Sequence, residues 1–219
     1  MVEGPGCTLN GEKIRARVSR GQRVLKMRGS QVTHTTQPGK SPFCSLHGTQ
    51  FSGVETLGKE LFMYFGQKAL RVHFGMNGSM RINPSVQKES DQAPVLQVCL
   101  SSDTVCFFHS SVEIRGTEEC EQKVLSSSHL DVCSPLFSQP RSEEAVKAQR
   151  SRMLCDVLLD QAVMPGVGNI IKNEALFDSG LHPGVKVQLL TDEQIHHLVR
   201  MTRDFTLLFY KVCRLVQLF

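Results

Sequence analysis

The residues Pro165-Gly166-Val167-Gly168-Asn169-Ile170-Ile171 carry the strongest structural signal in this sequence. Two glycines permit a tight turn in which backbone N–H groups can approach a ligand closely. A helix that follows such a turn adds the positive end of its dipole, and Asn169 adds a side-chain donor. The segment therefore has the chemistry of a phosphate clamp. A Gly-x-Gly turn alone is a weak signal, because many helix connections use glycine for steric reasons, and no strand precedes it as a dinucleotide-binding fingerprint requires.

Helices are predicted on both sides of this turn. The pattern predicts a helix over Asn169 to Asp178, ended by Gly180. Ser142 is suited to N-cap an earlier helix whose apolar positions run from Val146 to Leu158. Thr191 with Gln194 forms a capping box for a third helix, which carries an apolar face to Phe209. The sequence after Pro140 therefore reads as a helical domain.

The part of the chain before this helical region reads as strands and turns. Short apolar or alternating runs are punctuated by Gly, Asn, Pro and Asp, which is typical of an antiparallel sandwich or barrel; the runs are 62–65, 70–74, 95–100 and 104–108. The polar stretch 29–50 is predicted to be a long loop. We therefore expect an α+β protein with an N-terminal β-sandwich or barrel-like domain over 1–120, a linker over 121–140 and a helical domain over 141–219.

Composition indicates an ordinary globular protein. The chain has 219 residues, of which 40% are hydrophobic and 21% charged, and no apolar run is long enough to cross a membrane. We therefore expect a soluble intracellular protein without a membrane partner. The eight scattered cysteines are interpreted as reduced, mostly buried thiols. Cys44-x-x-His47 has half of a zinc-site spacing but lacks a second half, so no metal is expected there.

Positive charge is concentrated near the N-terminus. Seven basic residues and no acidic residue lie between Lys13 and Arg28. Through residue 120 the chain has 14 basic and 10 acidic residues, and from there to Phe219 it has 11 of each. The segment could be a solvated basic face, or it could bind nucleic acid where a polyanion meets the N-terminal amine.

The first five residues, Met1-Val2-Glu3-Gly4-Pro5, suggest a nucleophile. An initiator Met before a small residue such as Val is normally removed, which would leave Val2 at the terminus. A free α-amine has a pKa of about 7.7–8.0, against about 10.4 for Lys, so much more of it is neutral at pH 7. A neutral amine beside the Glu3 carboxylate can form a Schiff base with its own acid and base nearby. The alternative is an ordinary frayed terminus.

Four motifs in order resemble one enzyme family. The segment Pro165–Ile171, with Glu174–Phe177 and Gly180–Pro183, closely resembles the helix–two-turn–helix module of the formamidopyrimidine-DNA glycosylase/endonuclease VIII family. Val2-Glu3-Gly4-Pro5 is similar to the Pro-Glu-Gly-Pro start of endonuclease VIII-type members. Gly58-Lys59 before an apolar strand, and the turn His73–Ser79, resemble the conserved hairpin lysine and the His-x-Gly-Met-x-Gly turn.

The resemblance implies roles for nine residues. Val2 would attack C1′ of a damaged nucleoside through its α-amine, Glu3 would move protons on the deoxyribose, and Lys59 would hold the phosphate beside the lesion. The remaining residues would contact DNA: His73, Met76, Gly166, Gly168, Asn169 and Lys172. Met76 would fill the space left by a flipped-out nucleotide, although core packing is its alternative role. The family further implies base-excision repair of damaged DNA in the nucleus, and we expect a monomer.

The sequence departs from the family pattern in three places. The family's Asp-Pro-Arg-Arg-Phe-Gly-like loop plugs the duplex, whereas His109-Ser110-Ser111-Val112-Glu113 stands here. Ser111 cannot pair with a base edge and Glu113 would be repelled by the opposite strand, so single-stranded or unpaired DNA is the expected substrate. Val2 replaces the usual Pro, so base removal should survive better than β-elimination.

The third departure concerns metal. Family members end with a four-cysteine zinc finger, but the tail after the third helix carries no C-x-x-C, so no cofactor is expected. Two alternatives to an active glycosylase therefore stay open. One is a DNA-binding product of weak catalytic power, and the other is an unrelated phosphate-binding protein.

Overall fold

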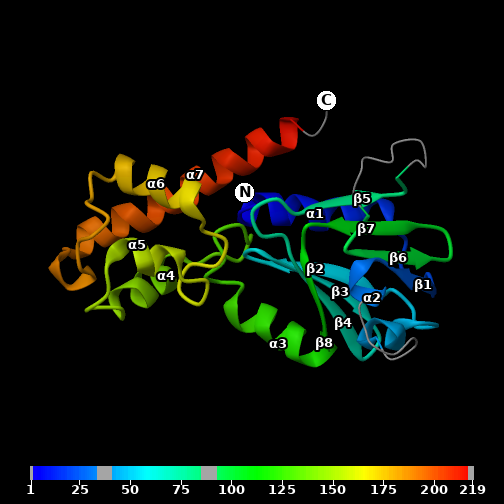
Figure 1. The fold of residues 1–219 in the computed structure, drawn as a ribbon. Coiled ribbons are helices and arrows are strands. Elements are labelled where there is room, and N and C mark those ends of the chain that lie inside the picture. The colour runs from blue at the N-terminus through cyan, green and yellow to red at the C-terminus, as the bar shows by residue number, and fades with distance from the viewer. Residues whose placement is uncertain (1, 34–40, 85–92, 217–219) are drawn as a thin grey trace. The chain divides into compact units, whose positions relative to one another are not determined.

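The computed structural model describes residues 2–33, 41–84 and 93–216 (Figure 1). The described residues form two compact units. One, here called the strand unit, contains Val2 and the described parts of 10–56 and 60–123. The other, the helical unit, contains 3–9, 57–59 and the chain from 124 onward. Short segments from the N-terminal half of the sequence therefore belong to the helical unit.

The strand unit contains two four-stranded antiparallel sheets, as predicted. One has the order β1-β6-β7-β5 and the other the order β2-β3-β4-β8. The strands are β1 Val24–Arg28, β2 Gly53–Leu57, β3 Glu60–Phe65, β4 Lys68–His73, β5 Ser79–Ile82, β6 Leu96–Leu100, β7 Thr104–Phe108 and β8 Ser111–Gly116. All four apolar runs found in the sequence overlap these strands.

Side-chain alternation explains how the sheets form a core. Buried and partly exposed residues alternate along β6, so one face of this strand points inward. On β3 every residue after Glu60 is buried, which is typical of a strand covered on both faces. The ring of Phe74, directly after β4, lies 6.4 Å from the ring of Phe107 on β7, centroid to centroid, and joins the two sheets.

The two longer helices in this part of the sequence, α1 and α3, were not predicted. Helix α1, Gly4–Arg17, contains three glycines, which disfavour helix by about 1 kcal/mol each. Packing explains two of them. A Cβ at Gly4 would lie 2.8 Å from the Cys133 Sγ, and one at Gly11 would lie 2.7 Å from the Thr56 Cγ2. Close packing therefore outweighs weak helix propensity.

Helix α3, Thr117–Ser127, is the second. It begins before the predicted linker and occupies its first residues, and Glu118 and Glu119 in its first turn favour the helix start. In the predicted loop over 29–50, the described residues include helix α2 Ser30–Thr33 and the short 3-10 helix η1 Pro42–Leu46. The rest of that prediction, over 34–40, lies outside the described residues.

The helical unit consists mainly of four helices around one apolar core. These are α4 Gln139–Lys147, α5 Leu154–Leu159, α6 Asn169–Asp178 and α7 Asp192–Val216, with the short 3-10 helix η2 Val187–Leu189 before α7. Helix α7 packs against both α4 and α6. The core is formed by fully buried apolar side chains, among them Leu154, Val157, Ile171 and Leu198.

Local signals predicted two of these helices well. Helix α6 has the predicted bounds, and Gly180 after it has a φ of +63°. The capping box is present, because the Gln194 Oε1 accepts the Thr191 N–H at 2.9 Å and the Thr191 Oγ1 accepts the Gln194 N–H at 3.2 Å.

The prediction of one helix from Ser142 to Leu158 was wrong. Helix α4 begins before Pro140, which its first turn tolerates, and Ser138 rather than Ser142 is the N-cap. Ser142 is fully buried inside the helix. At Met153 the backbone is extended and pairs with Lys186, so the chain starts a separate helix there.

The cysteine prediction is partly confirmed. All eight cysteines are among the described residues and none forms a disulfide. Three are buried, four are partly buried and Cys44 is exposed, so burial is less general than predicted. No described helix is long and apolar enough to cross a membrane, and the described residues contain no cluster of three or more His, Cys, Asp or Glu arranged to hold a metal.

Candidate active site

Glu3 is a buried carboxylate at the start of α6. Its side chain is 1% exposed. The Oε1 accepts the Ile170 N–H at 2.7 Å, and the Oε2 accepts the N–H groups of Gly168 and Ile171 at 3.2 Å each. The first N–H groups of a helix have no partner within the helix and carry its positive dipole end. Glu3 satisfies these donors with a full negative charge.

Gly168 is required for this arrangement. A Cβ at this position would lie 2.3 Å from the Glu3 Cδ, closer than any real contact. Gly166 has a φ of +96°, where an L side chain is strained, and its N–H donates to the Gln161 Oε1 at 3.0 Å. The amides of both glycines thus have acceptors inside the protein. The sequence suggested that these amides donate to a phosphate. Each amide could do so only if its hydrogen bond to Gln161 or to Glu3 were broken.

Two side chains at the start of α6 do face solvent. Asn169 is exposed and Lys172 is partly exposed, and the Lys172 Nζ donates to the Asn169 Oδ1 at 3.0 Å. The pair offers a cation and an amide donor on one helical turn. The predicted DNA contacts of this turn therefore rest on these side chains more than on the glycine amides.

Lys59 lies in the β2–β3 turn, and its charge is affected by its surroundings. Burial lowers the pKa of its amine, while the negative charge of Glu3 opposes that shift. Gly58 before it has a φ of +55°, and its N–H donates to the Asp131 Oδ2 at 2.8 Å. The structure therefore brings Lys59, Glu3 and the Gly166–Gly168 turn into one unit.

Val2 belongs to the strand unit, where it contacts the His73–Ser79 turn. The Val2 nitrogen donates to the Gly75 carbonyl at 3.3 Å, and the Gly75 N–H donates to the His73 Nδ1 at 3.2 Å. A Cβ at Gly78 would lie 2.1 Å from the Phe74 oxygen, so the turn needs glycine there. Met76 is 67% exposed at the tip, which excludes core packing as its role.

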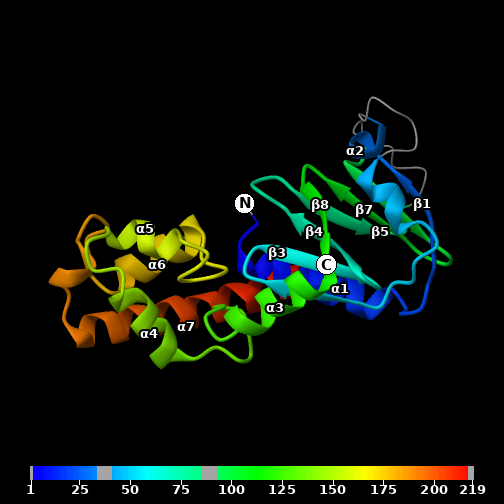
Figure 2. The same ribbon diagram turned by 90° about the horizontal axis from the view of Figure 1, so that it is seen from below.

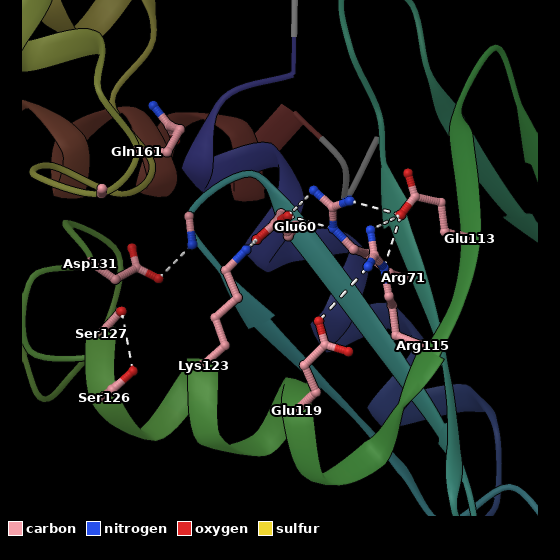
Figure 3. Close-up of polar contacts among 12 residues, drawn as sticks. Glu60, Arg71, Glu113, Arg115, Glu119, Lys123, Ser126, Ser127, Asp131 and Gln161 are labelled. Atoms are coloured by element: carbon pink, nitrogen blue, oxygen red, sulfur yellow. Dashed lines mark hydrogen bonds and ion pairs between the residues drawn. The ribbon is translucent and has the colours of Figure 1, made fainter.

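The stretch 109–113 differs from the expected loop. Strand β7 ends at Phe108 and β8 begins at Ser111, so only His109 and Ser110 connect them. Glu113 lies inside β8 and pairs with Arg71 at 3.1 Å and with Arg115 at 2.6 Å (Figure 3). These partners, Arg115 first, lower the pKa of Glu113. These arginines balance the charge of Glu113, which argues against the predicted repulsion of a DNA strand by this residue.

The basic residues from Lys13 to Arg28, here called the basic segment, lie away from Val2 within the strand unit. All seven except Lys13 are exposed. Strand β1 is the edge of its sheet opposite β5, which directly follows the turn that Val2 contacts. Figures 1 and 2 show β1 and that turn on different sides of the unit. The part of the basic segment on β1 therefore does not lie beside the amine, where the nucleic-acid interpretation placed it.

Comparison with known proteins supports the resemblance seen in the motifs. The N-terminal domain model of formamidopyrimidine-DNA glycosylase matches residues 1–116, and the H2TH domain model of the same enzyme matches residues 132–207. The chain belongs to this family. Its H2TH segment includes the turn before α6, all of α6 and the first part of α7.

Relatives in this family include endonuclease 8-like 3 of Bos taurus and of Homo sapiens, each 56% identical over 98% of this chain. The chain spans 39% of the length of either relative. Val2 in place of the family's Pro, together with the helical segment after Pro165, resembles this branch of the family, and these identities confirm the resemblance. Formamidopyrimidine-DNA glycosylase of Proteus mirabilis is 30% identical over 67% of the chain and 54% of its own length.

Solved structures show the family fold. A viral DNA glycosylase matches with a TM-score of 0.80 and 20% identity, covering 96% of this chain and 82% of its own. The Lactococcus lactis family enzyme, non-covalently bound to DNA containing an abasic site, matches with a TM-score of 0.79 and 18% identity, covering 96% and 82%. At these identities the likeness concerns the fold alone.

Sequence reasoning missed Asp131 and Gln161 as parts of the site. Gln161 lies five residues before Gly166, and its place at the start of the segment that leads to the two glycines was the available signal. Asp131 accepts the Cys133 N–H at 2.8 Å, a local turn pattern that Asp favours, but nothing nearby in sequence indicates its second bond to Gly58.

Proposed function

We propose that this chain performs the chemistry of a DNA glycosylase with abasic-site lyase activity in base-excision repair. After Met1 is removed, the neutral Val2 amine attacks C1′ of a damaged nucleoside. The C1′–base bond breaks as the N–C1′ bond forms, and the base leaves with a proton. The sugar ring opens to a Schiff base. Loss of a C2′ proton then expels the 3′-phosphate, and water releases the amine.

The observation that carries this proposal is the fixed carboxylate of Glu3, one residue from the amine. A carboxylate offers about four acceptor positions, and three are used by the amides at the start of α6. The remaining one, on Oε1, is available to accept or return a proton. The helix holds the carboxylate in place, so little reorganisation is needed when the sugar reacts.

DNA binding in this proposal depends on several polar side chains and on Met76. Lys59, kept charged with the help of Glu3, supplies a cation for the phosphate next to the lesion. Asn169 and Lys172 offer donors at the start of α6, and His73 lies in the turn that presents Met76. The exposed Met76 side chain is suited to occupy the space of an extruded nucleotide.

Borohydride trapping on a single-stranded abasic oligonucleotide tests the mechanism. The chain with Val2 at its terminus should give a covalent product, and Glu3→Gln should reduce the trapping rate by at least about tenfold, as loss of an acid–base group does. Chain that retains Met1 is the control and should bind DNA without being trapped. Equal trapping with Met1 present would contradict the Val2 nucleophile. Binding without trapping by the mature chain would favour the DNA-binding alternative.

A preference for single-stranded or unpaired DNA belongs to the same proposal. The two residues His109 and Ser110 form a turn too short to reach into a duplex and replace a base. Flipping a nucleotide from a duplex then costs its full unstacking energy, which a single strand avoids. We expect faster removal of a hydantoin lesion from a single strand than from a duplex of the same sequence. Faster removal from the duplex would contradict this preference.

A further inference from the structure

Asp131 is a buried acid that the proposed chemistry does not use. It lies between α3 and α4 and is 4% exposed. Its Oδ2 accepts the Gly58 N–H at 2.8 Å, and its Oδ1 accepts the Cys133 N–H at 2.8 Å. Figure 3 shows the Asp131 carboxylate directed at the β2–β3 turn. One side chain thus joins its own loop to the turn that carries Lys59.

The turn around Gly58 has little freedom to move. A Cβ on Gly58 would lie 2.6 Å from the Gly166 nitrogen and 3.0 Å from the Pro165 carbonyl carbon. Gly58 is therefore enclosed by the Pro165–Gly166 backbone, and the bond to Asp131 fixes its peptide plane. Because Lys59 follows directly, its Cα position is set by these contacts.

A charged carboxylate at position 131 costs free energy, because it is buried. Burial raises the pKa of Asp131, because a charged oxygen loses its hydration, although the two amides and Arg203 oppose that shift. Arg203 also donates to the Val132 carbonyl, and its guanidinium lies 5.1 Å from the Phe137 ring centroid. Among the described residues, the one long-range hydrogen bond of this buried acid goes to the turn that carries a functional lysine, which suggests more than general stability.

We propose that Asp131 is a positioning residue for Lys59. Its bond to Gly58 holds the β2–β3 turn so that the Lys59 amine meets a DNA phosphate without first ordering the loop. The inference rests on the proposed role of Lys59 in DNA binding. Ordering a loop on binding lowers affinity, so the effect falls on KM more than on kcat.

A double-mutant cycle with Lys59→Ala tests this inference on the full chain. Asp131→Ser keeps an oxygen for the Cys133 N–H but cannot also reach Gly58, and Asp131→Asn puts an amide NH2 where one acceptor stood. Each should raise KM for abasic single-stranded DNA about tenfold, with kcat nearly unchanged. A tenfold change corresponds to the net free energy of about one hydrogen bond. In the Lys59→Ala background neither should raise KM further.

Asp160 provides a matched control. It too accepts an N–H two residues ahead, from Ala162 at 2.9 Å, and pairs with an arginine, Arg152, at 2.7 Å. Asp160→Asn should combine additively with Lys59→Ala. Additive behaviour of both Asp131 variants, or failure of both to fold, would overturn the inference, because Asp131 would then be a structural residue. No effect of Lys59→Ala alone would instead contradict the proposed role of Lys59.

Discussion

A methyl group at position 168 would collide with the Glu3 carboxylate, so the glycine and the acid depend on each other. The backbone φ of Gly168 is −118°, which any residue can adopt, and only the contact requires glycine. The sequence showed the glycine and suggested a ligand amide. It could not show that the acceptor lies at position 3, because that contact spans 165 residues.

Replacing Gly168 with Ala should therefore disable the site. The added methyl displaces Glu3 from three amides, so we expect the free energy of unfolding to fall by about 1–3 kcal/mol and borohydride trapping to be lost. Gly180→Ala is the control, since Gly180 has a φ of +63° and nothing within 4 Å of an added Cβ. The Gly180→Ala variant should have a lower free energy of unfolding but an unchanged rate of borohydride trapping. Trapping by the Gly168→Ala variant at the wild-type rate would refute the arrangement.

The affinity for DNA should fall at alkaline pH, because Lys59 loses its charge there. Because burial lowers the pKa of its amine below 10.5, the charge is lost at a lower pH than in an ordinary lysine. A guanidinium stays charged throughout, so Lys59→Arg should retain affinity as the pH rises toward that value, where the wild type weakens. Fluorescence anisotropy on labelled single strands measures this. Lys172→Arg controls for a general lysine-to-arginine effect, and identical pH profiles for wild type and Lys59→Arg would contradict the prediction.

Among the elements, the basic segment has a position that its sequence did not reveal. Its charges lie along the second half of α1, in the connection after it and on β1, and every ion pair among the described residues lies outside it. Cations without carboxylate partners remain available for phosphates. On the opposite sheet edge from the Val2 contact, they would meet DNA flanking the lesion rather than the lesion itself.

Neutralising part of this segment should change the salt dependence of binding but not the chemistry. For Arg17→Gln, Arg20→Gln and Arg23→Gln combined, the slope of log affinity against log salt should fall by roughly 2, at about 0.7 per phosphate contact on single strands. The single-turnover rate at saturating protein should not change. Neutralising the paired cations Arg115, Lys123 and Lys147 instead should alter the slope less. An unchanged slope in the first variant would show that this face is only solvated.

Local signals predicted some elements, whereas contacts distant in sequence determined the others. The start of α6 and the Thr191 capping box were predictable because their hydrogen bonds join neighbours in sequence. Helix α1 was not, because its glycines disfavour helix and are explained only by Cys133 and Thr56. Residue chemistry suggested Val2, Glu3 and the turn from Gly166 to Asn169, and motif resemblance added the other site residues. The structure groups Glu3 with Lys59 and Val2 with the His73 turn, but Asp131 could be found only from its fold contacts.

At the scale of the whole molecule, the two compact units do not follow the order of the sequence. The helical unit includes 3–9 and 57–59, and these segments provide the Glu3 carboxylate and the Gly58 turn. The domain limits drawn from sequence, at 120 and 141, would separate these segments from their partners. Neither the match to the H2TH domain model nor the helical periodicity shows that the helical unit includes segments 3–9 and 57–59.

A fragment containing residues 124–219 alone should therefore be poorly stable. Without Glu3 the first N–H groups of α6 lose their carboxylate, and without Gly58 the buried Asp131 keeps a charge with one acceptor unused. We expect a thermal midpoint several degrees or more below that of the intact chain by circular dichroism. The intact Glu3→Gln variant separates the loss of charge from the loss of the segment. A fragment as stable as the intact chain would contradict this dependence.

The long separation between Glu3 and its amide partners has a consequence during synthesis. A ribosome adding about 5–20 residues per second needs roughly 8 to 33 s to make the 165 residues between Glu3 and Gly168. During that time the carboxylate has no helix to bind, and the start of the nascent chain stays open to an aminopeptidase. Burial of Glu3 would then follow exposure of the Val2 amine, so maturation and folding would occur in a set temporal order.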